Sequence, residues 1–418
     1  MLIAWMFACT GETTTPAPAP VITLAPTEPT VELPPPPPGQ WPTLLVSQAQ
    51  FVMQGGRAVP GPAHLVLLST DGTTWYERVL EDPKSNVFHK AVPWRDGILT
   101  IAGEDARLVH WKADAAGKFQ PTVLWEKSWG GKFDRLRDVE LGDVDGDGKE
   151  DIVLATHDQG VVAVGREGAD ATWTFTELDQ TPDTFVHEIE LGDVDGDGKT
   201  EFYATPSGRN RASGESQPGG VARYTWNADT KAFERTMIAS WDESHAKEIL
   251  VADVDGDGKS ELYAVREAHT EKGADGATVI KDPVRIVRLA PAADGTWTQT
   301  VVATLQDRQC RFLLPADVDG DGKKELIAAA WKTGLYLLKP QGDGTFASSL
   351  IDADSTGFEH ASWVADLDAN GTSELYVAAD DQGAVRRYQW SGTAFDRTEV
   401  APIPKKQRIT WNIQDGRF

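Results

Sequence analysis

Five copies of one acidic loop constrain the fold of this chain more than any other feature. The copies begin at Asp143, Asp193, Asp253, Asp317 and Asp366. Each has side-chain oxygens at positions 1, 3 and 5, an Asp or Glu at position 9, and a glycine at position 6. Ca²⁺ takes about six to eight hard oxygen ligands from a flexible loop, and a glycine allows the sharp turn. The sequence therefore predicts five Ca²⁺ sites and a repeated fold.

The sequence around the loops also repeats. An apolar strand precedes each loop, a second strand follows it, and a third leads into a turn before a fourth strand that opens with an aromatic residue. This aromatic residue occurs seven times, at Trp75, Phe119, Trp173, Phe233, Trp297, Phe346 and Phe395. Four strands per unit without helical periodicity are typical of a β-propeller. We expect an all-β, seven-bladed propeller with Ca²⁺ loops between the first and second strands of five blades.

The two ends of the chain each carry part of a repeat. Residues 63–81 supply later strands of a blade but no clear first strand, whereas residues 408–416 resemble a first strand and the start of a loop. We expect the terminal strands to pair and close the ring, which removes exposed sheet edges. The degenerate loops at 95–97 and 414–416 should bind no metal. The predicted propeller spans residues 42–418.

The loop pattern resembles the FG-GAP (VCBS-type) repeat of integrin α-subunit propellers and of bacterial surface proteins, over about residues 42 to 418. The resemblance implies that positions 1, 3, 5 and 9 bind Ca²⁺ through side chains and position 7 through its carbonyl. It also implies that the ions are structural and lie away from the ligand. The implied ligands are Asp143, Asp145, Asp147, Lys149 and Asp151; Asp193, Asp195, Asp197, Lys199 and Glu201; Asp253, Asp255, Asp257, Lys259 and Glu261; Asp317, Asp319, Asp321, Lys323 and Glu325; and Asp366, Asp368, Asn370, Thr372 and Glu374. Because Asn370 removes one charge, the fifth site should be the weakest.

The N-terminal segment points to export. Residues 1–9 are apolar and end in a sequence that resembles the lipobox of bacterial lipoproteins, in which Cys9 would be lipidated. Residues 10–41 are rich in Thr and Pro and predict a disordered, extended linker. We expect a protein of the bacterial cell envelope that contacts the membrane only through this anchor. Ordinary secretion and a non-exported protein are the alternatives.

A basic residue recurs six positions before the first metal ligand. Extended to the two degenerate repeats, this position holds His89, Arg137, His187, Lys247, Arg311, His360 and Arg408. Innermost strands line the central channel, so we expect a ring of basic side chains at its mouth, opposite the metals. Such a ring could hold an anion. Alternatively, these residues tie blades together or pair with the acids that follow three of them, Asp138, Glu188 and Glu248.

Two longer segments, 207–220 and 267–283, should open on the same face and contribute to recognition. We therefore predict a Ca²⁺-stabilised binding or adhesion module whose ligand is an acidic glycan or a protein. The alternatives are a lyase, in which Arg neutralises a carboxylate and His abstracts a proton, and a scaffold of an envelope complex. No catalytic residue is singled out, because no catalytic motif is visible. The net charge of −24 argues against nucleic acid.

Overall fold

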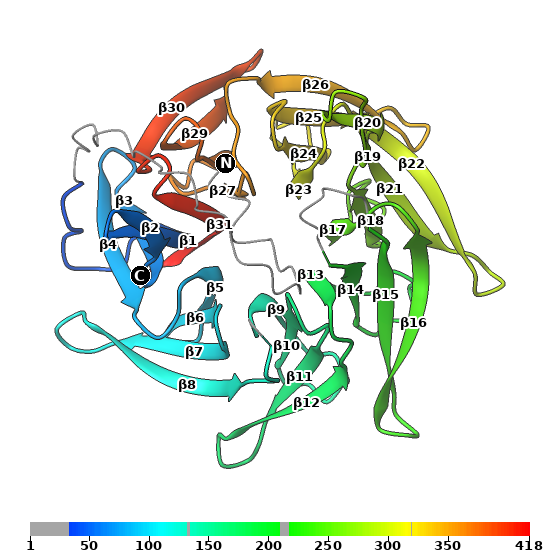
Figure 1. The fold of residues 1–418 in the computed structure, drawn as a ribbon, viewed down its shortest axis with the longest axis horizontal. Helices are drawn as coiled ribbons and strands as arrows, with labels where there is room; N and C mark the ends of the chain where they lie inside the picture. The colour runs from blue at the N-terminus through cyan, green and yellow to red at the C-terminus, as the bar shows by residue number, and fades with distance from the viewer. Residues whose placement is uncertain (1–32, 132–133, 210–216, 319) are drawn as a thin grey trace.

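Seven antiparallel sheets, six of four strands and one of five, surround a central axis in the computed structural model, which describes residues 33–131, 134–209, 217–318 and 320–418 (Figure 1). The predicted all-β, seven-bladed propeller is confirmed. From the innermost strand outward, blades 1 to 3 are β31 (Arg408–Arg417), β1 (Pro42–Gln54), β3 (Ala63–Thr70) and β4 (Trp75–Asp82); β5 (Phe88–Trp94), β6 (Gly97–Ala102), β7 (Ala106–Ala113) and β8 (Phe119–Lys127); and β9 (Leu136–Gly142), β10 (Asp151–Thr156), β11 (Val162–Glu167) and β12 (Trp173–Asp179).

The remaining blades follow the same plan, with one addition. In the same order, blades 4 to 7 are β13 (Thr184–Gly192), β14 (Glu201–Gly208), β15 (Gly219–Asn227) and β16 (Ala232–Trp241); β17 (Ala246–Ala252), β18 (Glu261–Arg266), β21 (Val284–Pro291) and β22 (Trp297–Leu305); β23 (Cys310–Ala316), β24 (Glu325–Ala330), β25 (Leu335–Pro340) and β26 (Phe346–Asp352); and β27 (Ser362–Ala365), β28 (Glu374–Ala379), β29 (Ala384–Trp390) and β30 (Phe395–Pro402). A hairpin of β19 (His269–Lys272) and β20 (Thr278–Asp282) extends blade 5 between β18 and β21.

Burial along each blade explains the sequence pattern. The second strand is largely buried, and every residue of β24 is buried, whereas most residues of the outer strand β26 are exposed. The aromatic residue that opens the fourth strand packs edge-on against the preceding blade. Trp297 contacts Tyr203 with ring centroids 6.2 Å apart, and Trp75 contacts Tyr376 at 6.1 Å. The repeated aromatic residues therefore stabilise the contacts between blades.

Blade 1 contains strands from both ends of the chain. β31 pairs antiparallel with β1, and the Trp41 N–H donates to the Phe418 carbonyl at 2.9 Å. Residues 414–416 belong to β31 and pair with β1, so the expectation of a degenerate loop there is wrong. Residues 33–41 of the predicted linker are described and contact the propeller, because the Glu77 N–H donates to the Pro34 carbonyl at 2.9 Å. The remainder of the linker, the signal-like segment and Cys9 lie outside the described residues.

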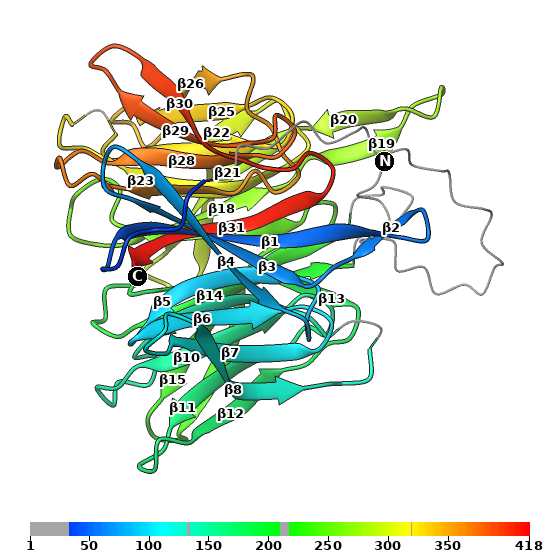
Figure 2. The same ribbon diagram turned by 90° about the vertical axis from the view of Figure 1, so that its left-hand side faces the viewer.

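Two hairpins project from the side opposite the end of β31 (Figure 2). One is formed by β2 (Arg57–Pro60) and the far part of β1, and the other by β19 and β20. Innermost strands begin on this side and run toward the acidic loops on the other. We call it the entry face. Among the residues that the structure describes, there is no helix long and apolar enough to cross a membrane.

Candidate binding face and metal loops

Four of the seven predicted ring residues converge at the start of the innermost strands. Arg137, His187, Lys247 and Arg311 lie on β9, β13, β17 and β23, and all four are buried. The Lys247 Nζ lies 2.5 Å from His187 Nε2. The Arg137 Nη2 donates to Glu359 Oε2 at 3.2 Å, and Arg311 donates to the other oxygen of the same carboxylate. Strands distant in the sequence thus bring these side chains together.

A local irregularity of the backbone positions them. In β5, β9 and β17 the pairing with the next strand skips one residue, and the skipped residues are His89, Arg137 and Lys247. In β13 and β23 the interrupted pairing includes His187 and Arg311. A bulge of this kind bends a strand and redirects a side chain. The basic residue is therefore the bulge residue of the innermost strand in five blades.

Glu359 is the intramolecular partner of this ring. It precedes β27, is 1% exposed, and accepts hydrogen bonds from arginines of blades 3 and 6, which are not neighbours. Arg311 also pairs with Glu267 Oε1 at 3.3 Å. Sequence reasoning missed Glu359. Part of the positive charge expected at the channel mouth is consequently neutralised within the protein.

Burial shifts the pKa values of Lys247 and His187, the other two members of the ring. Burial, opposed by the nearby Glu267 carboxylate, lowers the pKa of Lys247 to about 7. Burial and the Lys247 charge hold the pKa of His187 well below its usual range, so the imidazole is neutral. Within the described chain, Arg137 Nε, His187 Nδ1 and Arg311 Nη2 have no hydrogen-bond partner. The mouth therefore retains donor capacity beyond the Glu359 pairing.

The other three predicted ring residues form hydrogen bonds outside this cluster. The His89 Nδ1 lies 2.5 Å from the Leu136 carbonyl of blade 3. The His360 Nδ1 lies 2.7 Å from the Ala330 carbonyl of blade 6. Arg408 lies 3.4 Å from Gln48 Oε1 within blade 1. His89 and His360 therefore link neighbouring blades, which was the alternative explanation of the repeated position.

The acids that follow three ring residues do not pair with the ring. Asp138 Oδ1 accepts from Lys90 Nζ of the preceding blade at 2.8 Å, and its other oxygen accepts from the Ile189 N–H at 2.7 Å. Glu248 accepts from the Leu313 N–H at 3.2 Å. Burial, followed by the charges of neighbouring carboxylates, raises the pKa of Glu188 and Glu248 well above their usual range. Asp138 therefore links blades 2, 3 and 4, and Glu248 links blades 5 and 6.

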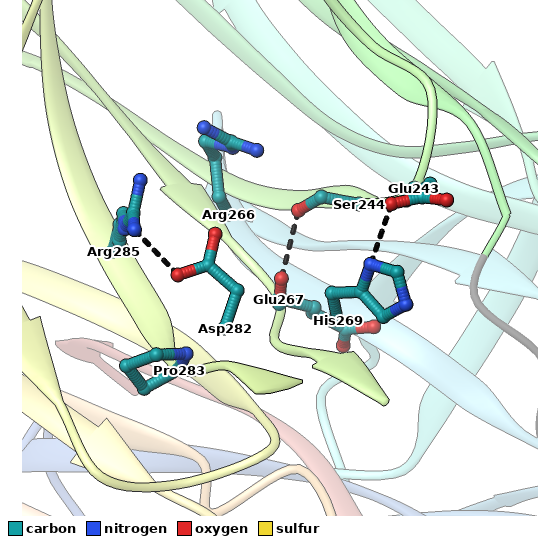
Figure 3. Close-up of a pocket in the computed structure, with 8 residues that line it drawn as sticks. All are labelled: Glu243, Ser244, Arg266, Glu267, His269, Asp282, Pro283 and Arg285. Atoms are coloured by element: carbon teal, nitrogen blue, oxygen red, sulfur yellow. Dashed lines mark hydrogen bonds and ion pairs between the residues drawn. The ribbon is translucent and has the colours of Figure 1, made fainter. Parts of the chain in front are cut away.

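A polar cavity of about 60 Å³ lies beside the β19–β20 hairpin (Figure 3). It is lined by Glu243, Ser244, Arg266, Glu267, His269, Asp282, Pro283 and Arg285. The long segment 267–283 was the sequence signal for this region. Sequence reasoning missed Arg266, Arg285 and Glu243, because the cavity forms only when the hairpin packs beside the start of β17.

The acidic loops bring together most of the acids predicted as metal ligands, but Asp147 is not among the grouped acids of the first loop. In two of them all four acids offer carboxylate oxygens within 4.8 Å of one another: Asp193, Asp195, Asp197 and Glu201, and Asp253, Asp255, Asp257 and Glu261. The first and fifth loops each bring three together: Asp143, Asp145 and Asp151, and Asp366, Asp368 and Glu374. The fourth loop includes Asp319, which lies outside the described residues. These oxygen-only donor sets suit a hard cation, and the carbonyl ligands at position 7 remain predictions.

Among the described residues, the acid at position 9 is the most buried ligand of its loop. Burial raises the pKa of Asp151 to about 6, opposed by the hydrogen bond from the Val144 N–H. Burial likewise raises the pKa of Glu201, Glu261 and Glu374. A cation bound among these carboxylates would favour their ionised forms. Cation binding and protonation should therefore compete at these loops.

A basic residue of the third strand reaches four of these loops, which sequence reasoning missed. The Arg166 Nε lies 2.8 Å from Asp145 Oδ2, and Arg223 pairs with Asp195 and Glu201. The other two are Arg288, 3.3 Å from Glu261, and Arg387, 3.9 Å from Asp368. Arg166 and Arg223 also lie over aromatic rings of the next blade. The distance from this arginine to the aromatic residue of the fourth strand varies from seven to ten residues, so alignment of the repeats on that residue does not reveal it.

Comparison with known proteins agrees with the repeat and the fold. The FG-GAP-like repeat model matches residues 143–204 and 317–377. No curated protein matches the chain. Similar solved structures include candidate 6-phosphogluconolactonases from Bacteroides fragilis (16% identity, 90% of this chain and 98% of that chain, TM-score 0.53) and Bacteroides uniformis (13%, 90% and 99%, 0.56). A Synechocystis apocarotenoid oxygenase variant is also similar (10%, 94% and 95%, 0.53).

At these identities the solved structures show likeness of fold alone. The two matches to the repeat model each begin at the first residue of an acidic loop and end within the second strand of the following blade, so each match includes two acidic loops. The chain is therefore a seven-bladed β-propeller that carries FG-GAP-like repeats.

Proposed function

We propose that this protein is an exported, Ca²⁺-stabilised binding module that engages an acidic glycan on its entry face. The observation that carries the proposal is the separation of two kinds of charge. Buried basic side chains and a polar cavity gather at the entry face, and the acidic loops occupy the other side. The small size and polar lining of the cavity favour a charged sugar over a protein. The loops would hold Ca²⁺ as part of the fold.

Electrophoresis through gels cast with polysaccharides tests this function. With Ca²⁺ present, a gel that contains a polyuronate should retard the 418-residue protein, and a gel that contains a neutral glucan should not. Added salt should restore the mobility, because charge attraction is screened. Equal migration through both gels would contradict glycan binding and direct the search to a protein partner.

A lyase is the alternative, and one observation favours it. Lys247 lies 2.5 Å from His187 and, with a pKa of about 7, is partly neutral at neutral pH, so it could accept a proton. Against this role, Lys247 is only 1% exposed. Cleared zones in the polyuronate gel would support the lyase, and intact gels would contradict it.

We further propose that Cys9 anchors the mature protein through a lipid. The lipobox-like sequence that ends at Cys9 and the Thr/Pro-rich segment after it support this. Mass spectrometry of protein produced in a bacterial host should find a lipid-modified cysteine at the mature N-terminus. Cys9→Ala should remove the lipid and release the protein from the membrane fraction. An unmodified Cys9 in the wild type would contradict the anchor.

A further inference from the structure

Arg266 is a charged group without a partner in the cavity beside the β19–β20 hairpin. It is the last residue of β18 and lies apart from the bonded pairs in Figure 3. In the part of the chain that the structure describes, no acceptor binds its guanidinium, and its Nε is buried. A buried polar group without a partner is costly. An acceptor that enters the cavity would remove this cost.

The other charged groups of the cavity already have partners. His269 Nδ1 lies 2.6 Å from Glu243 Oε2, and Arg285 Nη2 donates to Asp282 Oδ1 at 2.5 Å. Glu267 pairs with Arg311 of the ring. The carboxylates of the lining are therefore engaged, and the positive charge of Arg266 remains available.

The register of the sheet strengthens this argument. Arg266 of β18 and Arg285 of β21 are directly opposed residues of neighbouring strands, and both line the cavity. Like charges at opposed positions repel each other. Burial and the nearby Arg285 charge lower the pKa of Arg266. An anion beside Arg266 would offset both the repulsion and the loss of water.

Packing holds Arg266 in place. Its guanidinium lies 5.0 Å from the centre of the Trp241 ring, and the Trp241 indole N–H donates to Gln299 Oε1 at 3.0 Å. A guanidinium stacked on an aromatic ring keeps its planar edge free for two parallel hydrogen bonds to a carboxylate. A cavity of about 60 Å³ has room for a carboxylate group but not for a whole sugar.

We propose that this cavity is a carboxylate subsite, in which Arg266 binds the carboxylate of a uronic acid residue in the ligand. This proposal rests on the proposed glycan-binding function and identifies one residue that would contact the glycan. The rest of the sugar would lie outside the cavity, toward the hairpin. The channel ring, whose arginines already share Glu359, would be a neighbouring and separate site.

Titration with sodium D-glucuronate, followed by NMR at the Trp241 indole N–H, tests the subsite. The full chain with Ca²⁺ should show a saturable shift with glucuronate and none with D-glucose. Arg266→Gln should weaken binding by at least about tenfold, because it removes hydrogen bonds to a charged group. Arg308→Gln is the matched control, since Arg308 stacks on Trp331 at 5.3 Å but does not line the cavity.

A shift that saturates equally in Arg266→Gln, or no saturable shift in the wild type, would overturn the subsite. Arg266→Lys keeps the charge without the planar fork and should bind with intermediate affinity, which provides a second test if the glutamine variant does not fold. The two proposals can fail separately. Glucuronate binding that depends on Arg266, together with free passage through polyuronate gels, would support the subsite and contradict the glycan-binding function.

Discussion

Glu359→Ala should lower the free energy of unfolding by about 3–5 kcal/mol, because removal of one member of a buried ion pair leaves the other charge uncompensated. Here two guanidiniums, those of Arg137 and Arg311, lose the carboxylate that they share. Arg311 keeps its contact with Glu267, but Arg137 keeps no ion-pair partner among the described residues. Urea unfolding at constant Ca²⁺, followed by tryptophan fluorescence, measures the change.

Two control variants distinguish the loss of a buried ion pair from the loss of a charge at the surface. Glu167→Gln removes the partner of Arg95 in an exposed pair and should cost about 0–1 kcal/mol. Replacement of Glu359 and Arg137 together by leucine should restore part of the stability lost in Glu359→Ala, because apolar residues often replace buried ion pairs without loss and Arg311 keeps Glu267 as its partner. A Glu359→Ala variant within 1 kcal/mol of the wild type would show that water already compensates the two arginines.

The same pairing affects how the channel mouth can be tested for binding. Variants of Arg137 or Arg311 leave Glu359 buried without one of its partners, so they should lower stability as well as any affinity for an anion. The Arg266 guanidinium shares no hydrogen bond with the described chain, so its substitution tests recognition with less effect on folding.

The architecture could be predicted because each blade has the same local sequence pattern. Loop acids at fixed positions and a recurrent aromatic residue predict blades one at a time, and these patterns do not depend on tertiary contacts. The convergence of Arg137, His187, Lys247 and Arg311 was also predictable, because each stands at the same distance from a well-formed loop. The acidic clusters of the loops follow from the same regularity.

The predicted ring fails in three blades, and in two of them, blades 1 and 7, the register of the innermost strand differs from that of the other blades. In β31 the pairing with β1 skips Trp411, so the bulge residue of blade 1 is Trp411 and not Arg408. The misassigned loop at 414–416 caused this error. In blade 7, β27 begins only at Ser362 and His360 has a positive φ of 59°, so His360 turns to blade 6 and Glu359 reaches the arginines. A shift of one residue exchanges the faces of a strand, and sequence spacing does not show such a shift.

The cavity and the third-strand arginines were missed for a different reason. Arg266 and Arg285 become neighbours through the pairing of β18 with β21, although a 17-residue insertion separates those strands in the sequence. Charged residues are common in exposed strands, so a single arginine in the sequence does not indicate a binding site. Only the fold reveals which of them lack a partner.

Removal of the proposed Ca²⁺ ions should have the largest effect of all on the stability of this protein. A site present at 1,000 times its dissociation constant contributes about 4 kcal/mol to stability. The loss of several such sites should lower the melting temperature by on the order of 10 °C. The physical reason is visible in the loops, where three or four carboxylates lie within 4.8 Å of one another and one arginine offsets only part of their charge. Calorimetry with and without a chelator measures the change.

The contribution of a single loop can be measured with point variants that change the number of bound ions. Glu261→Gln should remove one ion from the bound total by weakening the third loop, whereas Asp294→Asn, in an exposed turn outside the loops, should leave the total unchanged. Asn370→Asp adds a carboxylate to the fifth loop and should tighten its binding, because affinity rises with ligand charge. Excess Mg²⁺ should not restore the melting temperature, since Mg²⁺ demands a tighter, octahedral site. A melting curve that chelation leaves unchanged would show that the loop arginines suffice to stabilise the loops, and the acidic clusters would then have no structural need of an ion.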